Sequence, residues 1–138
     1  MAQTETVTDT GIAELILLWR EELATGMESI VALEMATPCT AAVASTFADP
    51  ADTAIHHTDS GLLLAAIDTV GGATTNTAGD TITFDHVFTA TASKNVAGIH
   101  VCNNDDDVAF VECCFNAVLA MENTDTLTID GEVVIDQA

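Results

Sequence analysis

One stretch, Gly79–Ala92, constrains the fold of this chain more than any other. Its side chains alternate in character, with apolar residues on one side of an extended backbone and polar residues on the other. The first set is Ile82, Phe84, His86, Phe88 and Ala90, and the second is Thr81, Thr83, Asp85 and Thr89. A period of two over this length predicts a β-strand with one buried face. Because such a strand needs partners, the chain is expected to form a sheet.

A second alternating run lies near the C-terminus. Its apolar members are Leu127, Ile129, Val133 and Ile135, and its polar members are Thr126, Thr128, Asp130 and Glu132. Shorter apolar runs predict strands at Ser29–Ala36, within Thr53–Val70, and at Ala97–Cys102 and Val108–Leu119. In Thr53–Val70, the run Leu62–Ile67 favours a strand over a buried helix, because it is short and bounded by glycines.

The connections are marked by proline, glycine and polar residues. Thr37–Thr53 holds both prolines and is predicted to be a loop that crosses the sheet, while Gly71–Gly79 and Ser93–Val96 are predicted turns. Asn103–Asp107 is the predicted polar tip of a hairpin, and Glu122–Asp125 the turn before the last strand. The total is six or seven strands joined mostly by short turns.

The N-terminal part has a different pattern. Met1–Thr10 is polar and predicted to be an arm, and Gly11–Ala24 is predicted to be a helix. Its apolar residues recur at helical spacing: Ile12, Leu15, Ile16, Trp19 and Leu23. A chain of 138 residues is one domain by length, here residues 11–138 after the arm. The predicted fold class is mainly β, an antiparallel β-sandwich (jelly-roll-like) with one short N-terminal helix.

The charge balance excludes some classes of partner. The chain has 22 acidic residues, Arg20 and Lys94 as its only strong bases, and a net charge of −20. Nucleic acid and anionic membranes are not expected as partners, because phosphate binding needs clustered Lys and Arg. The acids are spread along a chain that is 49% hydrophobic, which indicates a folded acidic surface rather than a disordered tail.

Such a surface suits concentrated salt, where the Debye length falls to ~3 Å at 1 M and repulsion between carboxylates is screened. The composition is therefore interpreted as that of a halophile's protein. The alternative is an ordinary acidic protein.

No enzyme motif is present in the sequence: GxSxG, HExxH, the Walker loop and GxGxxG are all missing. The chain is therefore predicted not to be an enzyme, with no catalytic residue and no bound cofactor. Met1–Asp9 does not have the character of a signal peptide, and no apolar run reaches the ~20 residues of a membrane span.

One metal site is a hypothesis from the sequence. Asn103, Asp105 and Asp107 place oxygen ligands at alternate positions, as a calcium loop begins, so a divalent cation is the candidate ligand. The glycine of the sixth position is missing, and the twelfth position holds Cys114 rather than glutamate. The alternative is a solvated acidic hairpin tip.

The histidines and cysteines give weaker signals. His56 and His57 are adjacent and would point to opposite faces of a strand, and His86 is predicted to be a core histidine, with joint zinc binding by His86 and Cys102 as the alternative. The cysteines are Cys39, Cys102, Cys113 and Cys114. They have no zinc spacing, and the last two cannot easily bond each other. Buried free thiols are the favoured interpretation, with disulfides as the alternative.

The order of these segments resembles a family of small tail-fibre-like or capsid-decoration modules of tailed viruses. Thr8–Ala13 resembles that family's "TNAGLA", Ile82–Ser93 its "TFTHTFTATGS", Val96–Asn103 its "VAGIGVVN", and Met121–Ile135 its "L(A/T)NGDTLTVTWTI". The chain departs from the family at Glu34–Pro38, where glycines are usual, and at Gly131–Val133, where the family has a closing aromatic residue.

Together with the acidic composition, the resemblance implies a virion structural protein of a halophilic archaeal tailed virus. It would be a self-associating module, a trimer or pentamer, that decorates the capsid (as a decoration or turret protein) or the tail and contacts other capsid or tail proteins. One alternative is a receptor- or glycan-binding fibre module that uses the loops Thr37–Thr53 and Asn103–Asp107, although the chain has no Tyr and one Trp for sugar stacking. Another is a cellular halophilic β-sandwich protein.

Overall fold

The computed structural model describes residues 28–42, 45–73, 80–102 and 109–135. Within these ranges the chain forms β-strands and no helix, so it is mainly β, as predicted. The eight strands are β1 (Ser29–Glu34), β2 (Ile55–His56), β3 (Ala65–Ala66), β4 (Thr69–Ala73), β5 (Asp80–Thr89), β6 (Lys94–Cys102), β7 (Ala109–Met121) and β8 (Thr126–Ile135).

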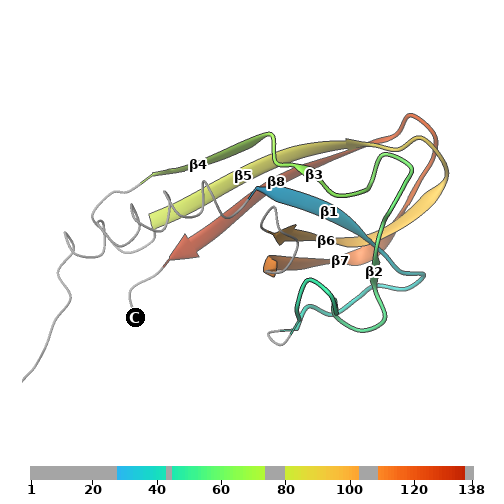
Figure 1. Cartoon of the computed structure of the whole chain (residues 1–138), viewed down its shortest axis with the longest axis horizontal. Helices are drawn as coiled ribbons and strands as arrows, with labels where there is room; N and C mark the ends of the chain where they lie inside the picture. Colours follow the sequence, from blue (N-terminus) through green and yellow to red (C-terminus); the bar gives the residue numbers. More distant parts are fainter. Residues whose placement is uncertain (1–27, 43–44, 74–79, 103–108, 136–138) are drawn as a thin grey trace, which may run out of the picture.

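The strands form two antiparallel sheets (Figure 1). One has the order β2-β1-β6-β7, with β3 pairing β1 as a fifth strand. The other has the order β4-β5-β8. Both β2 and β3 pair with the same strand: β2 meets the end of β1 at Leu33 and Glu34, and β3 meets its start at Ser29 and Ile30.

The second half of the chain is a nested pair of hairpins. β5 pairs with β8 in ten consecutive residue pairs, and between them β6 pairs with β7. The turns that follow β5 and β7 lie side by side, since Ala90 N–H donates to the Asp125 carbonyl and Thr124 N–H donates to the Ala90 carbonyl, both at 2.8 Å. At the turn after β5 the chain passes from the three-stranded sheet to the five-stranded sheet, and at the turn after β7 it passes back (Figure 1).

Both sheets contribute to one hydrophobic core, and the predicted alternation of β5 and β8 is confirmed. In β5, the apolar face is buried and Thr83, Val87 and Thr89 are exposed. The main core cluster comprises Ile30, Ala32, Leu62, Phe84, Phe88, Ala90, Val96, Ile99, Val101, Met121 and Ile129. His86 is also buried on this face, as predicted, with its ring 4.4 Å from that of Phe88.

Several predicted boundaries were wrong. Thr69–Ala73 forms β4 along β5, although a turn-rich connection was predicted from Gly71 onward. In Leu62–Ile67 only Ala65 and Ala66 form a strand. The chain turns just before this run, through Ser60 at φ 61° and Gly61 at φ 74°. Of the run, Leu62 is buried in the core and Ile67 is partly buried against it. The predicted arm Met1–Thr10 and helix Gly11–Ala24 lie outside the described residues.

A glycine in β8 makes room for a core aromatic ring. Gly131 is directly opposite Phe84 in the ladder, and a Cβ atom at position 131 would overlap with the Phe84 ring. Because Phe84 is 4% exposed, its ring cannot move aside without leaving the core. This close approach accounts for the glycine at position 131.

We expect Gly131→Ala to lower the free energy of unfolding by about 2 kcal/mol, because overpacking of a core costs about 1–3 kcal/mol. Urea unfolding at high salt measures the change. The neighbouring Glu132→Ala alters an exposed side chain and should change stability by less than about 0.5 kcal/mol. Equal effects of the two substitutions would contradict this account.

The outer face of the three-stranded sheet carries like charges on neighbouring strands. Asp85 is the direct partner of Asp130 in the β5–β8 ladder, and Thr83 is the partner of Glu132. Like charges at directly opposite positions destabilise a sheet by about 0.2–1 kcal/mol, and salt screens this repulsion.

Asp130→Asn should therefore stabilise the protein by about 0.5 kcal/mol in about 0.1 M salt and have almost no effect in about 1 M salt. Thermal unfolding at both salt concentrations checks this difference. Thr128→Asn, on the same face of β8 and without a charge change, is the control. A stabilisation of equal size at both salt concentrations would show that repulsion is not its cause.

Candidate functional site

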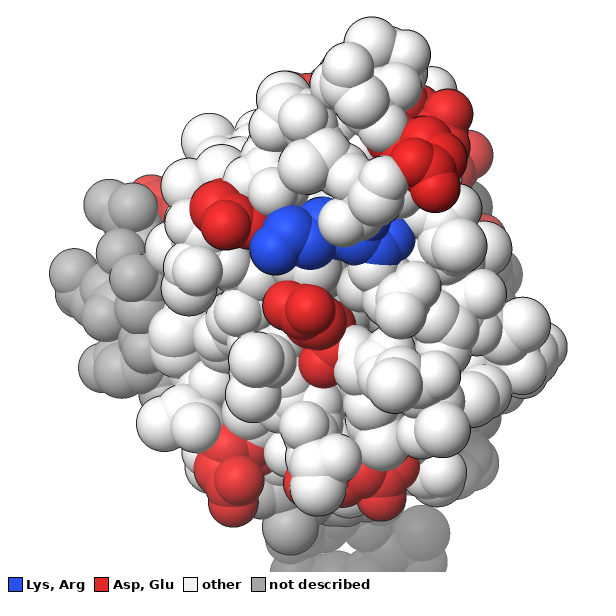
Figure 2. Space-filling model, turned by 90° about the vertical axis from the view of Figure 1, so that its right-hand side faces the viewer, with Lys and Arg blue, Asp and Glu red and all other residues white. Residues whose placement is uncertain are grey.

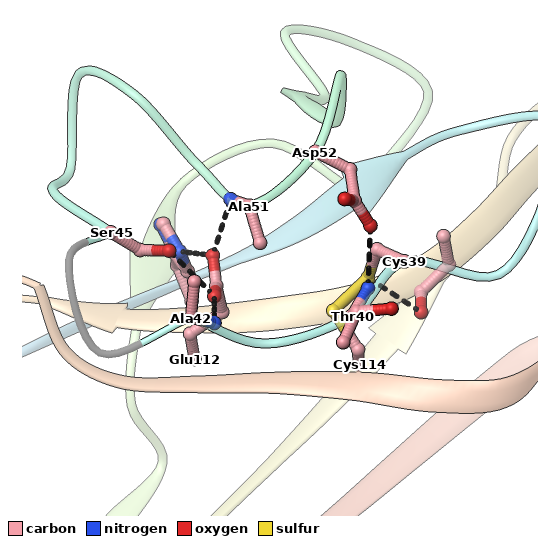
Figure 3. Close-up of a disulfide and its surroundings, with 10 residues drawn as sticks. Cys39, Thr40, Ala42, Ser45, Ala51, Asp52, Glu112 and Cys114 are labelled. Carbon is pink, nitrogen blue, oxygen red and sulfur yellow. Dashed lines mark hydrogen bonds and ion pairs between the residues drawn. A yellow bond between two sulfur atoms is a disulfide. The ribbon is translucent and has the colours of Figure 1, made fainter.

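The segment 37–53 forms a loop over the outer face of the five-stranded sheet, the face turned away from the main core. It was predicted to be a loop, and its described residues form no strand. A second apolar cluster lies beneath it, built from Leu33 of β1, Ala97 of β6, and Cys39 and Ala54 at the two ends of the loop. We refer to residues 37–53 as the outer loop. Figure 3 shows how it is joined to the sheet.

The first link is a disulfide between Cys39 and Cys114 of β7, with 5.3 Å between their Cα atoms (Figure 3). The prediction of buried free thiols was therefore wrong for these two residues. It was also wrong for Cys113, which has a thiol but is exposed. Cys102 is buried, as predicted, with its Sγ 3.6 Å from the Ser29 carbonyl. Adjacent strand residues face opposite sides of a sheet, so Cys114 reaches the outer loop and Cys113 does not.

The second link is the carboxylate of Glu112, which is two residues before Cys114 and therefore on the same face of β7. Its Oε2 accepts hydrogen bonds from Ala42 N–H at 2.9 Å and Ser45 Oγ–H at 2.8 Å (Figure 3). Its Oε1 accepts from Ala51 N–H at 2.8 Å and from His100 Nε2 at 2.7 Å. One side chain thus holds both halves of the outer loop.

The electrostatics of Glu112 favour its charged form. Burial raises the pKa of this carboxyl, since only 6% of the side chain is exposed. The hydrogen bonds from Ala51, Ala42, His100 and Ser45 outweigh burial, and the net shift of the Glu112 pKa is downward. Glu112 is therefore an ionised, fully bonded anchor at neutral pH.

A pair of histidines extends this network away from the loop. His100 donates Nε2–H to Glu112, because a carboxylate can only accept. In neutral His100 the other ring nitrogen, Nδ1, accepts a hydrogen bond from His56 Nε2 at 3.0 Å. Burial, together with the charge of His100, lowers the pKa of His56 to about 4, so His56 is neutral at pH 7. The ring of Phe47, from the outer loop, lies 4.3 Å from the His56 ring.

His57 points elsewhere and does not join this pair, as expected for adjacent residues. Its Nε2 donates to the Asn95 carbonyl at 2.8 Å, and its Nδ1 lies 3.5 Å from Glu34 Oε2. His86 and Cys102 lie in different sheets, against Asp68 and Ser29 respectively. Nothing in these contacts supports a joint zinc site.

Two hollows flank the outer loop. One, of about 310 Å³, is lined by Val31, Phe47, His56, His57, Thr58, Leu63 and Leu64. The other, of about 390 Å³, is lined by Ala41, Ala42, Ser45, Ala109, Phe110 and Glu112. In the first, His56 Nε2 and His57 Nε2 are engaged in the bonds described above. Among the described residues that line the second, Glu112 is the one ionisable side chain.

The predicted metal ligands Asn103, Asp105 and Asp107 lie outside the described residues. Among the residues that the structure does describe, no three His, Cys, Asp or Glu side chains form a group that can hold a metal ion. The same residues include no helix with the length and hydropathy to cross a membrane.

The surface near Lys94 has few basic groups, as the charge balance of the sequence predicts. Lys94, the one Lys or Arg in the described ranges, places its Nζ 3.0 Å from Asp59 Oδ1. Figure 2 shows basic atoms bordered by acidic side chains on this face of the molecule. The surrounding atoms are mostly uncharged, so no basic patch exists there that could bind phosphate groups.

The main residues of this site, Glu112, His100 and the Cys39–Cys114 pair, were not predicted as a group. One signal was available for Glu112: it is the only charged residue in Ala109–Met121, an otherwise uncharged strand. A charge in such a run is expected to have a buried partner. For the pairing of Cys39 with Cys114, no signal was available beyond the even count of four cysteines.

No family model matches this chain, and no curated protein or solved structure matches it either.

Proposed function

We propose that this chain is a non-enzymatic structural protein of a virion, a surface module of the capsid or tail of a tailed virus that infects a halophilic archaeon. The observation that carries the proposal is the disulfide between the outer loop and β7. Disulfides persist on virion surfaces and in other oxidising surroundings and are rare in reducing cytosol. A loop that is cross-linked and also held by a buried carboxylate is a rigid surface, which suits a docking role more than catalysis.

The topology supports a jelly-roll-like β-sandwich as the fold of this module. In a jelly roll, a long antiparallel ribbon folds over so that its inner and outer strand pairs lie in different sheets. Here β6–β7 is the inner pair and β5–β8 the outer pair, and the two pairs belong to different sheets. A sandwich of this kind suits a particle surface, because its two sheets cover the hydrophobic core from both sides.

The acidic surface supports a high-salt habitat for the particle. Asp85 and Asp130 stand directly opposite each other on an outer face, and the whole chain carries a charge of −20. Such surfaces repel one another in dilute buffer, and contacts between copies then depend on screening. A self-associating module of this composition is therefore expected to assemble in concentrated salt.

The decisive experiment locates the chain in the particle. Mass spectrometry of purified virions from the virus that encodes this chain should detect the protein in many copies, and image reconstruction should place the two sheets at the capsid or tail surface. Detection only in the soluble fraction of infected cells, with none in washed particles, would refute the proposal.

The second candidate function is a host-receptor or glycan-binding module. The observation that favours it is the hollow of about 310 Å³ beside the outer loop, with Phe47 and His56 in its wall. An aromatic ring and imidazole edges are groups that sugars contact. A glycan array probed with wild-type protein and with Phe47→Ala tests it: hits that disappear in the variant would support this function, and an array without hits would refute it.

A further inference from the structure

His57 has a buried ring nitrogen that faces a carboxylate instead of a hydrogen-bond donor. The residue is 2% exposed. Its Nε2 lies 2.8 Å from the Asn95 carbonyl, and because a carbonyl oxygen only accepts, Nε2 carries the proton of this bond. In a neutral ring this leaves Nδ1 as an acceptor. Nδ1 has no hydrogen-bond partner among the described residues, and it lies 3.5 Å from Glu34 Oε2.

Two acceptors that face each other in a buried site are unfavourable. The ionised carboxylate of Glu34 can only accept, so neutral His57 leaves the Nδ1 lone pair without a donor and directed at a negative charge. A buried polar atom without a partner destabilises a fold. A proton on Nδ1 removes both problems, because Nδ1 becomes a donor and the ring becomes a cation opposite the carboxylate. The Glu34 side chain is 41% exposed, so it can adjust to a donor.

The charged groups near His57 leave room for a second cation. Lys94 is the one like charge beside it, and its Nζ is paired with Asp59 Oδ1 at 3.0 Å. Within the described ranges, His57 is the one base that contacts the Glu34 carboxylate. The pair of Lys94 and Asp59 is neutral as a whole, so Glu34 keeps an unbalanced negative charge unless His57 is protonated.

All of these groups come from described segments, namely residues 28–37, 55–62 and 90–97. Glu34 is the last residue of β1 and Lys94 is the first residue of β6. Both lie at the strand ends opposite to those that continue into residues 1–27 and 103–108. The contact therefore involves described residues only.

We infer that His57 forms a proton-dependent contact, in which a proton taken from solvent onto Nδ1 joins it to Glu34 and fixes the chain after β2 to β1 and β6. The backbone N–H of His57 donates to the Ala32 carbonyl of β1 at 3.0 Å, and Nε2–H donates to Asn95 of β6. With Nδ1–H on Glu34, every N–H group of His57 has an acceptor. When this proton is lost, the contact with Glu34 becomes repulsive and this end of the five-stranded sheet loosens. The inference is independent of the proposed function.

The proton-dependent contact makes stability depend on pH in a defined direction. The folded protein binds this proton more tightly than the unfolded chain, in which a histidine titrates near about pH 6.5. The contribution to stability is therefore complete below that pH and is lost as the pH rises toward about 8. The direction is opposite to that for Glu112, whose contribution is lost as the pH falls.

The test compares wild type with Glu34→Gln in the full-length protein at about 1 M KCl. Glutamine has nearly the shape of glutamate, carries no charge, and its amide N–H can donate to Nδ1 of a neutral ring. Neutral His57 then has a donor, so the variant does not need the proton. Glu132→Gln is the matched control, because it makes the same chemical change at an exposed position of β8 in the other sheet.

Nitrogen NMR of the imidazole rings reports which ring nitrogens carry a proton. In wild type at about pH 6, both nitrogens of His57 should be protonated. Glu34→Gln should lower the proton affinity of His57 about tenfold, and Glu132→Gln should leave it unchanged. His86, whose Nδ1 lies 3.2 Å from Asp68 Oδ2, is the internal reference and should respond to neither substitution. An unprotonated Nδ1 in wild type at about pH 6, as a bridging water molecule would produce, would overturn the inference.

Thermal unfolding gives the second measurement. Between about pH 8 and about pH 6, the melting temperature of wild type should rise by about 4 °C more than that of Glu34→Gln. Glu132→Gln should follow wild type. Hydrogen exchange at the His57 amide, relative to its intrinsic rate, should slow over the same range in wild type and not in Glu34→Gln. Equal responses of wild type and Glu34→Gln would refute the contact. If Glu34→Gln does not fold, the protonation of Nδ1 in wild type decides the question.

Discussion

The double variant Cys39→Ala/Cys114→Ala should lose about 4 kcal/mol of unfolding free energy. The two cysteines are 75 residues apart in sequence, so their bond closes a long loop in the unfolded chain. In the chain-entropy view such a cross-link contributes about 3 kcal/mol for 15 residues and about 4.7 kcal/mol for 100 residues. Urea unfolding at constant high salt, with and without a reductant, measures the loss.

Cys113→Ala is the control for this variant. Cys113 is adjacent to Cys114 but exposed and outside the disulfide, so its replacement should change stability by less than about 0.5 kcal/mol. Reductant should lower the stability of wild type and of Cys113→Ala alike, and leave the double variant unchanged. Alkylation of all four cysteines in the denatured, unreduced protein would contradict the disulfide.

Glu112→Gln should lower the free energy of unfolding by about 3 kcal/mol at pH 7, because an amide removes the charge and one of two acceptor oxygens. The four donors that now bond this carboxylate would then compete for one oxygen. The outer loop should also become more accessible, which amide hydrogen exchange of residues 40–51 detects. Glu132→Gln makes the same chemical change at an exposed position of β8 and should have almost no effect in high salt.

The lowered pKa of Glu112 also predicts how the difference in unfolding free energy between wild type and Glu112→Gln depends on pH. A carboxyl whose folded pKa lies below its ordinary value of 4.5 stabilises the fold above that pH. Its contribution is lost as the pH falls through the folded pKa. The gap between wild type and Glu112→Gln should therefore be constant near neutrality and shrink below about pH 4.5. A gap that grows as the pH falls from 7 to 4 would show that the carboxyl is not held in its charged form.

The alternation in the sequence was enough to predict the strand β5 and its buried face. A strand exposes successive side chains to opposite sides, so Ile82, Phe84 and Phe88 had to share one face and Thr83 the other. The same reasoning placed β8. It failed at Thr69–Ala73, because two glycines in a short segment indicate a turn unless a neighbouring strand pairs with them, as β5 does. Pairing between segments is not visible in a local pattern.

The candidate site could not be predicted for the same reason, because its residues are far apart in the sequence. Glu112 bonds Ala42, 70 residues away, and Cys39 bonds Cys114, 75 residues away, and no spacing rule connects such positions. The sequence by itself determined the mainly β class, the faces of β5 and β8 and the acidic surface, because these follow from the period of side chains along an extended backbone and from composition. Only the tertiary structure decided that the outer loop lies across β7, because the folding of one segment onto another sets which side chains share a buried space.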